Sequence, residues 1–115
     1  MKIQTLITIA LLSLVLSGVA NGQGKTVVAA YEVVLSDFRP PATSNGGATF
    51  KACTECERQL VRVTGTTRYS VNGKTVRLDQ FKAAVATAND RDKTLVIVLH
   101  HLESNTLTSI DVSVR

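Results

Sequence analysis

Aromatic residues are scarce in this chain of 115 residues, which holds three Phe, two Tyr and no Trp. Platforms that stack the bases of single-stranded nucleic acids are built from aromatic rings, so no extensive platform of this kind is expected. The net charge of +4 is modest, and acidic residues are interspersed among the Lys and Arg residues. This is not the clustered basic pattern of a nucleic-acid-binding domain. A weakly basic chain is suited instead to contacts with anionic surfaces.

Catalytic signatures are also absent from the sequence. It contains no G-x-S-x-G, no H-E-x-x-H, no EF-hand spacing and no paired Cys clusters. Gly24-Lys25-Thr26 matches the end of a phosphate-binding loop, but Val19 stands where the first Gly of that motif is required. We therefore expect a non-enzymatic protein that carries no cofactor.

The N-terminal stretch has the three-part layout of a secretory signal peptide. Lys2 supplies a positive start, an apolar run follows from Ile3 to Val19, and small residues stand at Ala20 and Gly22. We predict a signal peptide over residues 1–22, with an uncleaved membrane anchor as the alternative. Its short basic start and small-residue cleavage site are typical of bacteria and predict a periplasmic or secreted protein.

Residues 23–115 then form one small β-rich domain of about 93 residues. β-Branched and alternating residues predict strands over 25–36, 48–52, 57–64, 68–71, 74–77, 94–102 and 108–115. Asn72-Gly73 is the strongest two-residue hairpin signal in the chain. The apolar run Leu95–Leu99 predicts the most buried strand, covered on both faces.

One amphipathic helix is predicted over about residues 79–89. Asp79 is suited to the N-cap position, where its carboxylate can accept a bond from a free amide of the first turn. The apolar residues that follow it share one helical stripe: Phe81, Ala84, Val85 and Ala88.

The predicted fold class is α+β with mostly antiparallel strands, in the order β-β-β-β(hairpin)-α-β-β. This order, with the helix before the last two strands, resembles small exported OB-like domains. The resemblance implies a small barrel, and an open sheet with the helix on one face is the competing architecture.

Cys53-x-x-Cys56 lies in a predicted turn, and three interpretations of the pair remain open. In an exported protein a structural disulfide is favoured. A redox-active pair would need its first Cys at a helix N-terminus, but the flanking residues read as strands. A zinc site would need four ligands, which only His100 and His101 could complete, and adjacent strand residues point to opposite faces. Weak metal candidates are therefore Cys53, Cys56, His100 and His101, and no metal is expected.

His100-His101 ends the apolar strand and could serve catalysis only with a partner such as Glu103 or Asp111. We favour a strand-end pair in which one His is buried and hydrogen-bonded and the other is solvated.

A possible binding face is formed by Arg58, Arg62, Arg68 and Tyr69. In OB-like domains the second and third strands carry the binding surface, so these residues predict a weakly basic groove for an anionic polymer or a peptide. A solvated sheet face is the competing interpretation. We expect an exported, non-enzymatic binding or accessory module whose partner is a protein or an anionic polymer of the cell envelope. It would use these strands and the loop at residues 37–47. A thiol-redox or metal-handling protein that uses the Cys53-x-x-Cys56 pair is the alternative.

Overall fold

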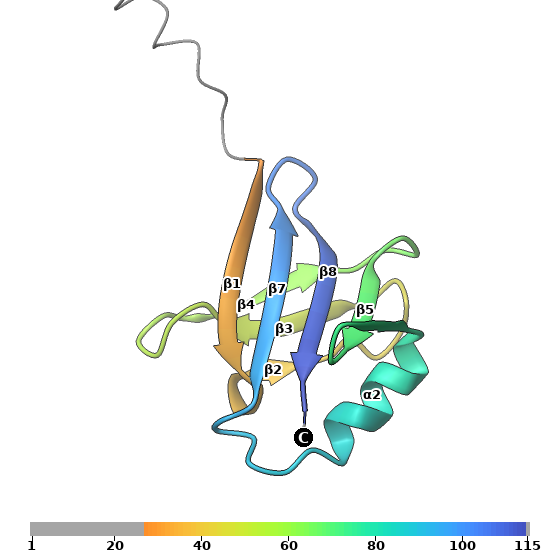
Figure 1. The fold of residues 1–115 in the computed structure, drawn as a ribbon. Helices are drawn as coiled ribbons and strands as arrows, with labels where there is room; N and C mark the ends of the chain where they lie inside the picture. The colour runs from red at the N-terminus through yellow and green to blue at the C-terminus, as the bar shows by residue number, and fades with distance from the viewer. Residues whose placement is uncertain (1–26, 115) are drawn as a thin grey trace, which may run out of the picture.

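The computed structural model describes residues 27–114 (Figure 1). The elements are β1 (Val28–Val34), the 3-10 helix η1 (Leu35–Asp37), β2 (Phe38–Arg39), β3 (Gly47–Lys51), β4 (Arg58–Arg62), β5 (Arg68–Val71), β6 (Lys74–Val76), α2 (Leu78–Ala86), β7 (Leu95–His101) and β8 (Thr106–Ser113). The predicted signal peptide lies outside the described residues. Residues 27–114 include no helix that is long and apolar enough to cross a membrane.

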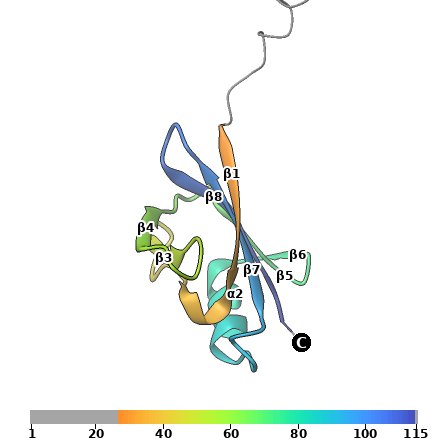
Figure 2. The ribbon, with the colours of Figure 1, turned by 90° about the vertical axis from the view of Figure 1, so that its left-hand side faces the viewer.

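The strands form two layers that cross each other (Figures 1 and 2). The front layer has the order β1-β7-β8-β5-β6, and the back layer has the order β4-β3-β2. They join where Arg62 of β4 pairs with Thr106 of β8 in parallel. The path of paired strands ends at β1 on one side and β2 on the other, so the sheet is open and the predicted OB-like barrel is not confirmed. The α+β class with mostly antiparallel pairing is confirmed, and β5–β8 and β4–β8 are the parallel exceptions.

The core lies between the two layers. Tyr31 of β1 packs on Phe50 of β3 with ring centroids 5.5 Å apart, which ties the front layer to the back layer. At one end of the sandwich Phe81 of α2 packs on Phe38 at 6.3 Å and on Tyr69 at 5.4 Å. All three Phe residues are therefore buried. The few aromatic residues of this chain are used for packing rather than for an exposed stacking surface.

The Asn72-Gly73 hairpin between β5 and β6 is confirmed. Asn72 has φ 55° and Gly73 has φ 84°, the left-handed conformations that a two-residue turn of this kind requires. The backbone N–H of Asn72 also donates to Val112 O at 2.8 Å, and its Oδ1 accepts from the N–H of Val114 at 2.8 Å. The turn is thereby attached to the end of β8.

The helix starts earlier than predicted, and Asp79 is not its N-cap. Arg77 holds that position, and its backbone N–H donates to Oε1 of Gln80 at 2.9 Å, so a side chain inside the first turn caps the helix. The helix also ends at Ala86 rather than near residue 89, since the C-cap Thr87 leaves the helical conformation at φ −98° and ψ 1°. Phe81 and Val85 of the predicted stripe are buried.

The prediction that Leu95–Leu99 is buried on both faces was wrong. Val96 and Val98 are fully buried, whereas Leu95 is 42% exposed and Ile97 is 39% exposed. The back layer and α2 both pack on the same side of the front layer, and no described element covers the other side (Figure 2). β7 is therefore a half-exposed strand whose outer residues are apolar.

Candidate binding face

The outer face of the back layer carries four cationic side chains around one exposed leucine. On each strand the residues alternate, so that Phe38, Ala48, Phe50 and Val61 point into the core. The alternate residues point outward, and we call five of them the basic face: Arg39, Lys51, Arg58, Leu60 and Arg62.

Strand pairing brings these residues together from three strands. Arg39 pairs with Thr49, and Thr49 in turn pairs with Leu60, so the three form one row across the layer. Lys51 pairs with Arg58 in the next row. Arg58 and Arg62 lie two residues to either side of Leu60, about 7 Å away along β4. The exposed leucine is therefore flanked by positive charge along its own strand and across the layer.

Leu60 is 67% exposed, which is the largest exposure among the large apolar residues of the described chain. Its side chain leans over Gly47, since a Cβ added at Gly47 would lie 2.7 Å from Leu60 Cδ1. The missing side chain at Gly47 thus leaves the space that Leu60 occupies on this face.

The cations of the basic face are not neutralised within the described chain. Among residues 27–114 the only ion pair within 4.0 Å joins Arg77 to Asp79, at the start of α2. Arg58 donates from Nη1 to the backbone carbonyl of Asp37 at 3.2 Å, which positions the guanidinium and leaves its charge uncompensated. The face therefore presents its positive charge to solvent.

Two residues of the predicted face do not lie on it. Arg68 is exposed, but it belongs to β5 and pairs with Ser109 of β8, on the outer side of the front layer. Tyr69 is only 6% exposed and packs on Phe81 in the core. Burial raises the pKa of its hydroxyl above the ordinary value, and its Oη has no hydrogen-bond partner among the described residues. The chain bends between β4 and β5, which sends the two strands into different layers.

Arg39 was predicted only as part of the contact loop at residues 37–47, and Lys51 was not predicted as a binding residue. Arg39 precedes Pro40-Pro41, and this composition predicted a loop, whereas the structure forms the two-residue strand β2. Lys51 lies in the predicted strand at residues 48–52. Its position next to the apolar Phe50 indicates that its side chain points away from the core. Only the pairing of β3 with β2 and β4 shows that both cations join the same face.

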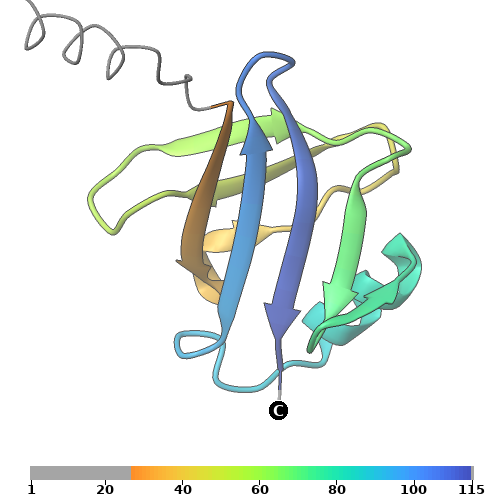
Figure 3. The ribbon, with the colours of Figure 1, turned by 45° about the horizontal axis from the view of Figure 1, so that its top comes forward.

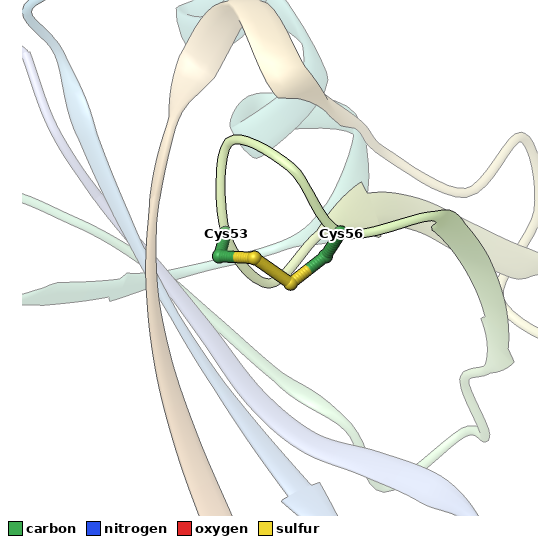
Figure 4. Close-up of a disulfide and its surroundings, with 2 residues drawn as sticks. All are labelled: Cys53 and Cys56. Atoms are coloured by element: carbon green, nitrogen blue, oxygen red, sulfur yellow. A yellow bond between two sulfur atoms is a disulfide. The ribbon is translucent and has the colours of Figure 1, made fainter.

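Cys53 and Cys56 form a disulfide in the turn between β3 and β4, with their Cα atoms 5.0 Å apart (Figure 4). The backbone N–H of Cys56 also donates to Cys53 O at 3.1 Å, so a disulfide and a backbone hydrogen bond both join the two ends of the turn. The flanking elements are strands, so neither sulfur lies at a helix N-terminus that would activate it as a thiolate.

The two His residues point to opposite sides of β7. His100 is buried, and its Nε2 lies 2.8 Å from Asn105 Oδ1. His101 lies on the outer side with its Nδ1 3.0 Å from Ser104 Oγ. Within residues 27–114 no group of three or more His, Cys, Asp or Glu side chains is arranged to hold a metal ion. The structure does not bring the histidines and the cysteines together.

Comparison with known proteins adds no assignment, because no family model, no curated protein and no solved structure matches this chain.

Proposed function

We propose that this protein is an exported, non-enzymatic binding module that holds an anionic partner on its basic face. The partner is an acidic protein segment or an anionic polymer of the cell envelope. The single observation that carries the proposal is the gathering of Arg39, Lys51, Arg58 and Arg62 around Leu60 with no ion pair to any described acidic residue.

The composition of the face fits this role better than a merely solvated surface. A solvated sheet face usually mixes both signs of charge, and no acidic side chain points outward from β2, β3 or β4 here. Guanidinium groups bind carboxylates and phosphates in two-pronged geometry, and three of the four cations are arginines. The basic face is thus suited to an ordered series of anionic groups.

Leu60 gives the face a selective element. An exposed leucine between two arginines favours a partner that presents an apolar group among its charges, because that contact removes apolar surface of both molecules from water. The disulfide is consistent with an oxidising compartment outside the cytosol. The predicted strand order resembles that of OB-like domains, whose second and third strands carry the binding surface, and this resemblance favours β3 and β4 as binding strands.

Charge reversal on the two layers tests this function. We expect Arg58→Glu/Arg62→Glu to lower the affinity for an acidic model chain, polyglutamate or polygalacturonate, by at least roughly a hundredfold in calorimetric titration. The matched control Arg68→Glu/Lys74→Glu changes the net charge equally on exposed residues of the front layer. It should retain affinity within a fewfold.

Wild-type binding should also weaken as salt is raised, because the cations of the basic face are exposed to solvent. Equal losses in the two double variants would show that overall charge, and not this face, governs binding. If the wild-type protein binds neither polyglutamate nor polygalacturonate at low salt, the proposed function is wrong.

A further inference from the structure

The front layer ends in a strand whose outer edge is free. β1 pairs with β7 on one side, and no described strand pairs with its other side (Figure 3). The pairing runs without interruption from Val28 opposite His101 to Val34 opposite Leu95. The free edge is therefore seven residues long and regular along its whole length.

The direction of the free backbone groups follows from two hydrogen bonds at the ends of β1. Leu102 N donates to Val27 O at 2.8 Å, and Leu35 N donates to Thr94 O at 2.8 Å. Because bonding alternates along an antiparallel pair, the odd-numbered residues of β1 face β7. The N–H and C=O groups of Val28, Ala30, Glu32 and Val34 consequently face outward.

The edge has little of the usual protection against pairing. Natural edge strands carry Lys, Pro, bulges or inward charges that prevent a second strand from adding. The sequence of β1 is VAAYEVV, with Glu32 as its only charge, and its register with β7 shows no shift from Val28 to Val34. This edge is suited to pairing.

The side chains next to this edge form an apolar face. On the outer side of the front layer lie Val28, Ala30 and Val34 of β1 with Leu95, Ile97 and Leu99 of β7, and we call these six residues the apolar face. A shallow hollow of about 320 Å³ lies over the small side chain of Ala30, between Glu32 and Ile97. Val28 is 38% exposed and Ile97 is 39% exposed, so apolar surface remains uncovered beside the free edge.

We propose that β1 pairs antiparallel with β1 of a second copy of this chain, around a two-fold axis at Tyr31. In this register Val28 lies opposite Val34 of the second copy, and Ala30 lies opposite Glu32 of the second copy. All outward-facing N–H and C=O groups of both strands then find partners, and the front layers join into one continuous sheet.

The sequence of β1 selects this register among the symmetric ones. Moving the axis to Glu32 would place two carboxylates directly opposite each other, which is destabilising. Moving it to Ala30 would leave Val34 without a partner. Only the axis at Tyr31 uses the whole strand. It also places Glu32 of the second copy beside the hollow at Ala30, where the methylene groups of that Glu32 would cover apolar surface.

The disulfide turn provides a second contact for the same neighbour. The turn between β3 and β4 projects past β1 on the side of the back layer (Figures 1 and 2). A cleft of about 110 Å³ separates residues 51–54 of this turn from Glu32–Val34. The second copy would place Ala29 opposite Val33, so a small core-facing side chain lies over the turn. Cys53–Cys56 would then hold the turn in the shape that supports the neighbouring strand.

The oligomeric state of the natively processed protein is the first test. We expect sedimentation equilibrium to show a monomer–dimer equilibrium between micromolar and millimolar concentration. A monomer over this whole range would overturn the proposal, and it would leave binding of anionic partners on the back layer unaffected.

A charge exchange tests the register. Ala30→Glu places a carboxylate opposite Glu32 of the second copy at two symmetric positions, and we expect dimer affinity to fall roughly tenfold. The double variant Ala30→Glu/Glu32→Lys restores opposite charges across the seam and should regain that affinity. Failure of the double variant to regain it would overturn the register.

Proline substitutions test the edge itself. Ala30→Pro removes one outward N–H from β1 and should leave the protein monomeric in sedimentation equilibrium. Circular dichroism verifies that the variant is folded. The control Thr75→Pro removes an outward N–H from β6, the other edge of the same layer. It should dimerise as the wild type does. A dimer in Ala30→Pro, or equal loss in both variants, would place the interface elsewhere.

Discussion

The two outer faces of this molecule are built by the same strand alternation, yet they differ in chemistry. The basic face of the back layer gathers four cations from three short strands around Leu60. The apolar face of the front layer gathers aliphatic residues from the long pair β1–β7 beside a free strand edge. The first is suited to an anionic partner recognised by side chains, and the second to a partner recognised by backbone pairing. A domain of this size thus offers two separate surfaces for two kinds of contact.

The largest expected effect comes from breaking the core that separates the two faces. Phe50→Ala removes the buried ring that packs on Tyr31 across the layers, and we expect the free energy of unfolding to fall by about 3–5 kcal/mol. Leu60→Ala, an apolar truncation on the outer side of the same layer, should change it by less than about 0.5 kcal/mol. Urea unfolding measures both. Similar losses would mean that Leu60 is packed rather than exposed.

The disulfide should matter less than the core. Cys53→Ser/Cys56→Ser is expected to lower the free energy of unfolding by about 1–2 kcal/mol, because so short a loop restrains little chain entropy. The protein from its native compartment should have a mass two hydrogens below that of the dithiol and resist mild reductant. Two thiols open to alkylation in that sample would contradict a structural disulfide and favour a thiol-redox role.

A single added charge should distinguish the two faces. Leu60→Lys adds a fifth cation to the basic face and should raise polyglutamate affinity roughly fivefold, the equivalent of about 1 kcal/mol. Ile97→Lys adds the same charge to the front layer, between Glu32 and Asp111, and should leave that affinity unchanged. Titrations of the two variants under the same salt conditions give the comparison. An equal rise in both would mean that binding follows net charge alone.

Tyr69 gives a prediction about pH. Its hydroxyl is buried without a partner, so Tyr69→Phe should leave polyanion binding unchanged and raise stability at neutral pH by about 1 kcal/mol. Because burial raises its pKa in the folded state, the unfolded chain loses this proton first as pH rises above about 10. Wild-type stability should therefore fall above that pH by more than the stability of Tyr69→Phe, as urea unfolding on both sides of pH 10 would show. Loss of polyanion binding in the variant would return Tyr69 to the binding face.

The smallest expected effect is a displacement of Leu60 without a change of charge. An alanine Cβ at Gly47 would meet Leu60 Cδ1, and this exposed side chain can rotate away, so Gly47→Ala should alter stability by less than about 0.5 kcal/mol. The affinity for an acidic peptide that also carries leucine side chains should fall by roughly a fewfold, because the displaced Leu60 contacts those side chains less well. Gly65→Ala, where an added Cβ meets nothing within 4 Å, is the matched control. Identical affinities in both variants would show that Leu60 does not contribute to binding.

Much of the local structure could be predicted from sequence, and part of the candidate site could be as well. Asn72-Gly73 predicted its hairpin, and Phe81 and Val85 predicted the buried side of the helix, because these signals depend on neighbours close in the chain. Arg58 and Arg62 were assigned to one face for the same reason. Arg39 was predicted in a contact loop and not on a strand, because β2 exists only through its pairing with β3 and a two-residue strand has no periodicity of its own.

The amino-acid sequence by itself determined which residues alternate, where the chain turns and that its charge is weakly positive. Only the tertiary structure decided which alternating residues share a surface. It placed Tyr69 in the core, Arg68 on the opposite layer from Arg62, and Leu95 and Ile97 in solvent. The physical reason is that alternation specifies two sides of a strand but not which side is covered. That choice depends on where the back layer and α2 pack, and those contacts join residues far apart in the chain.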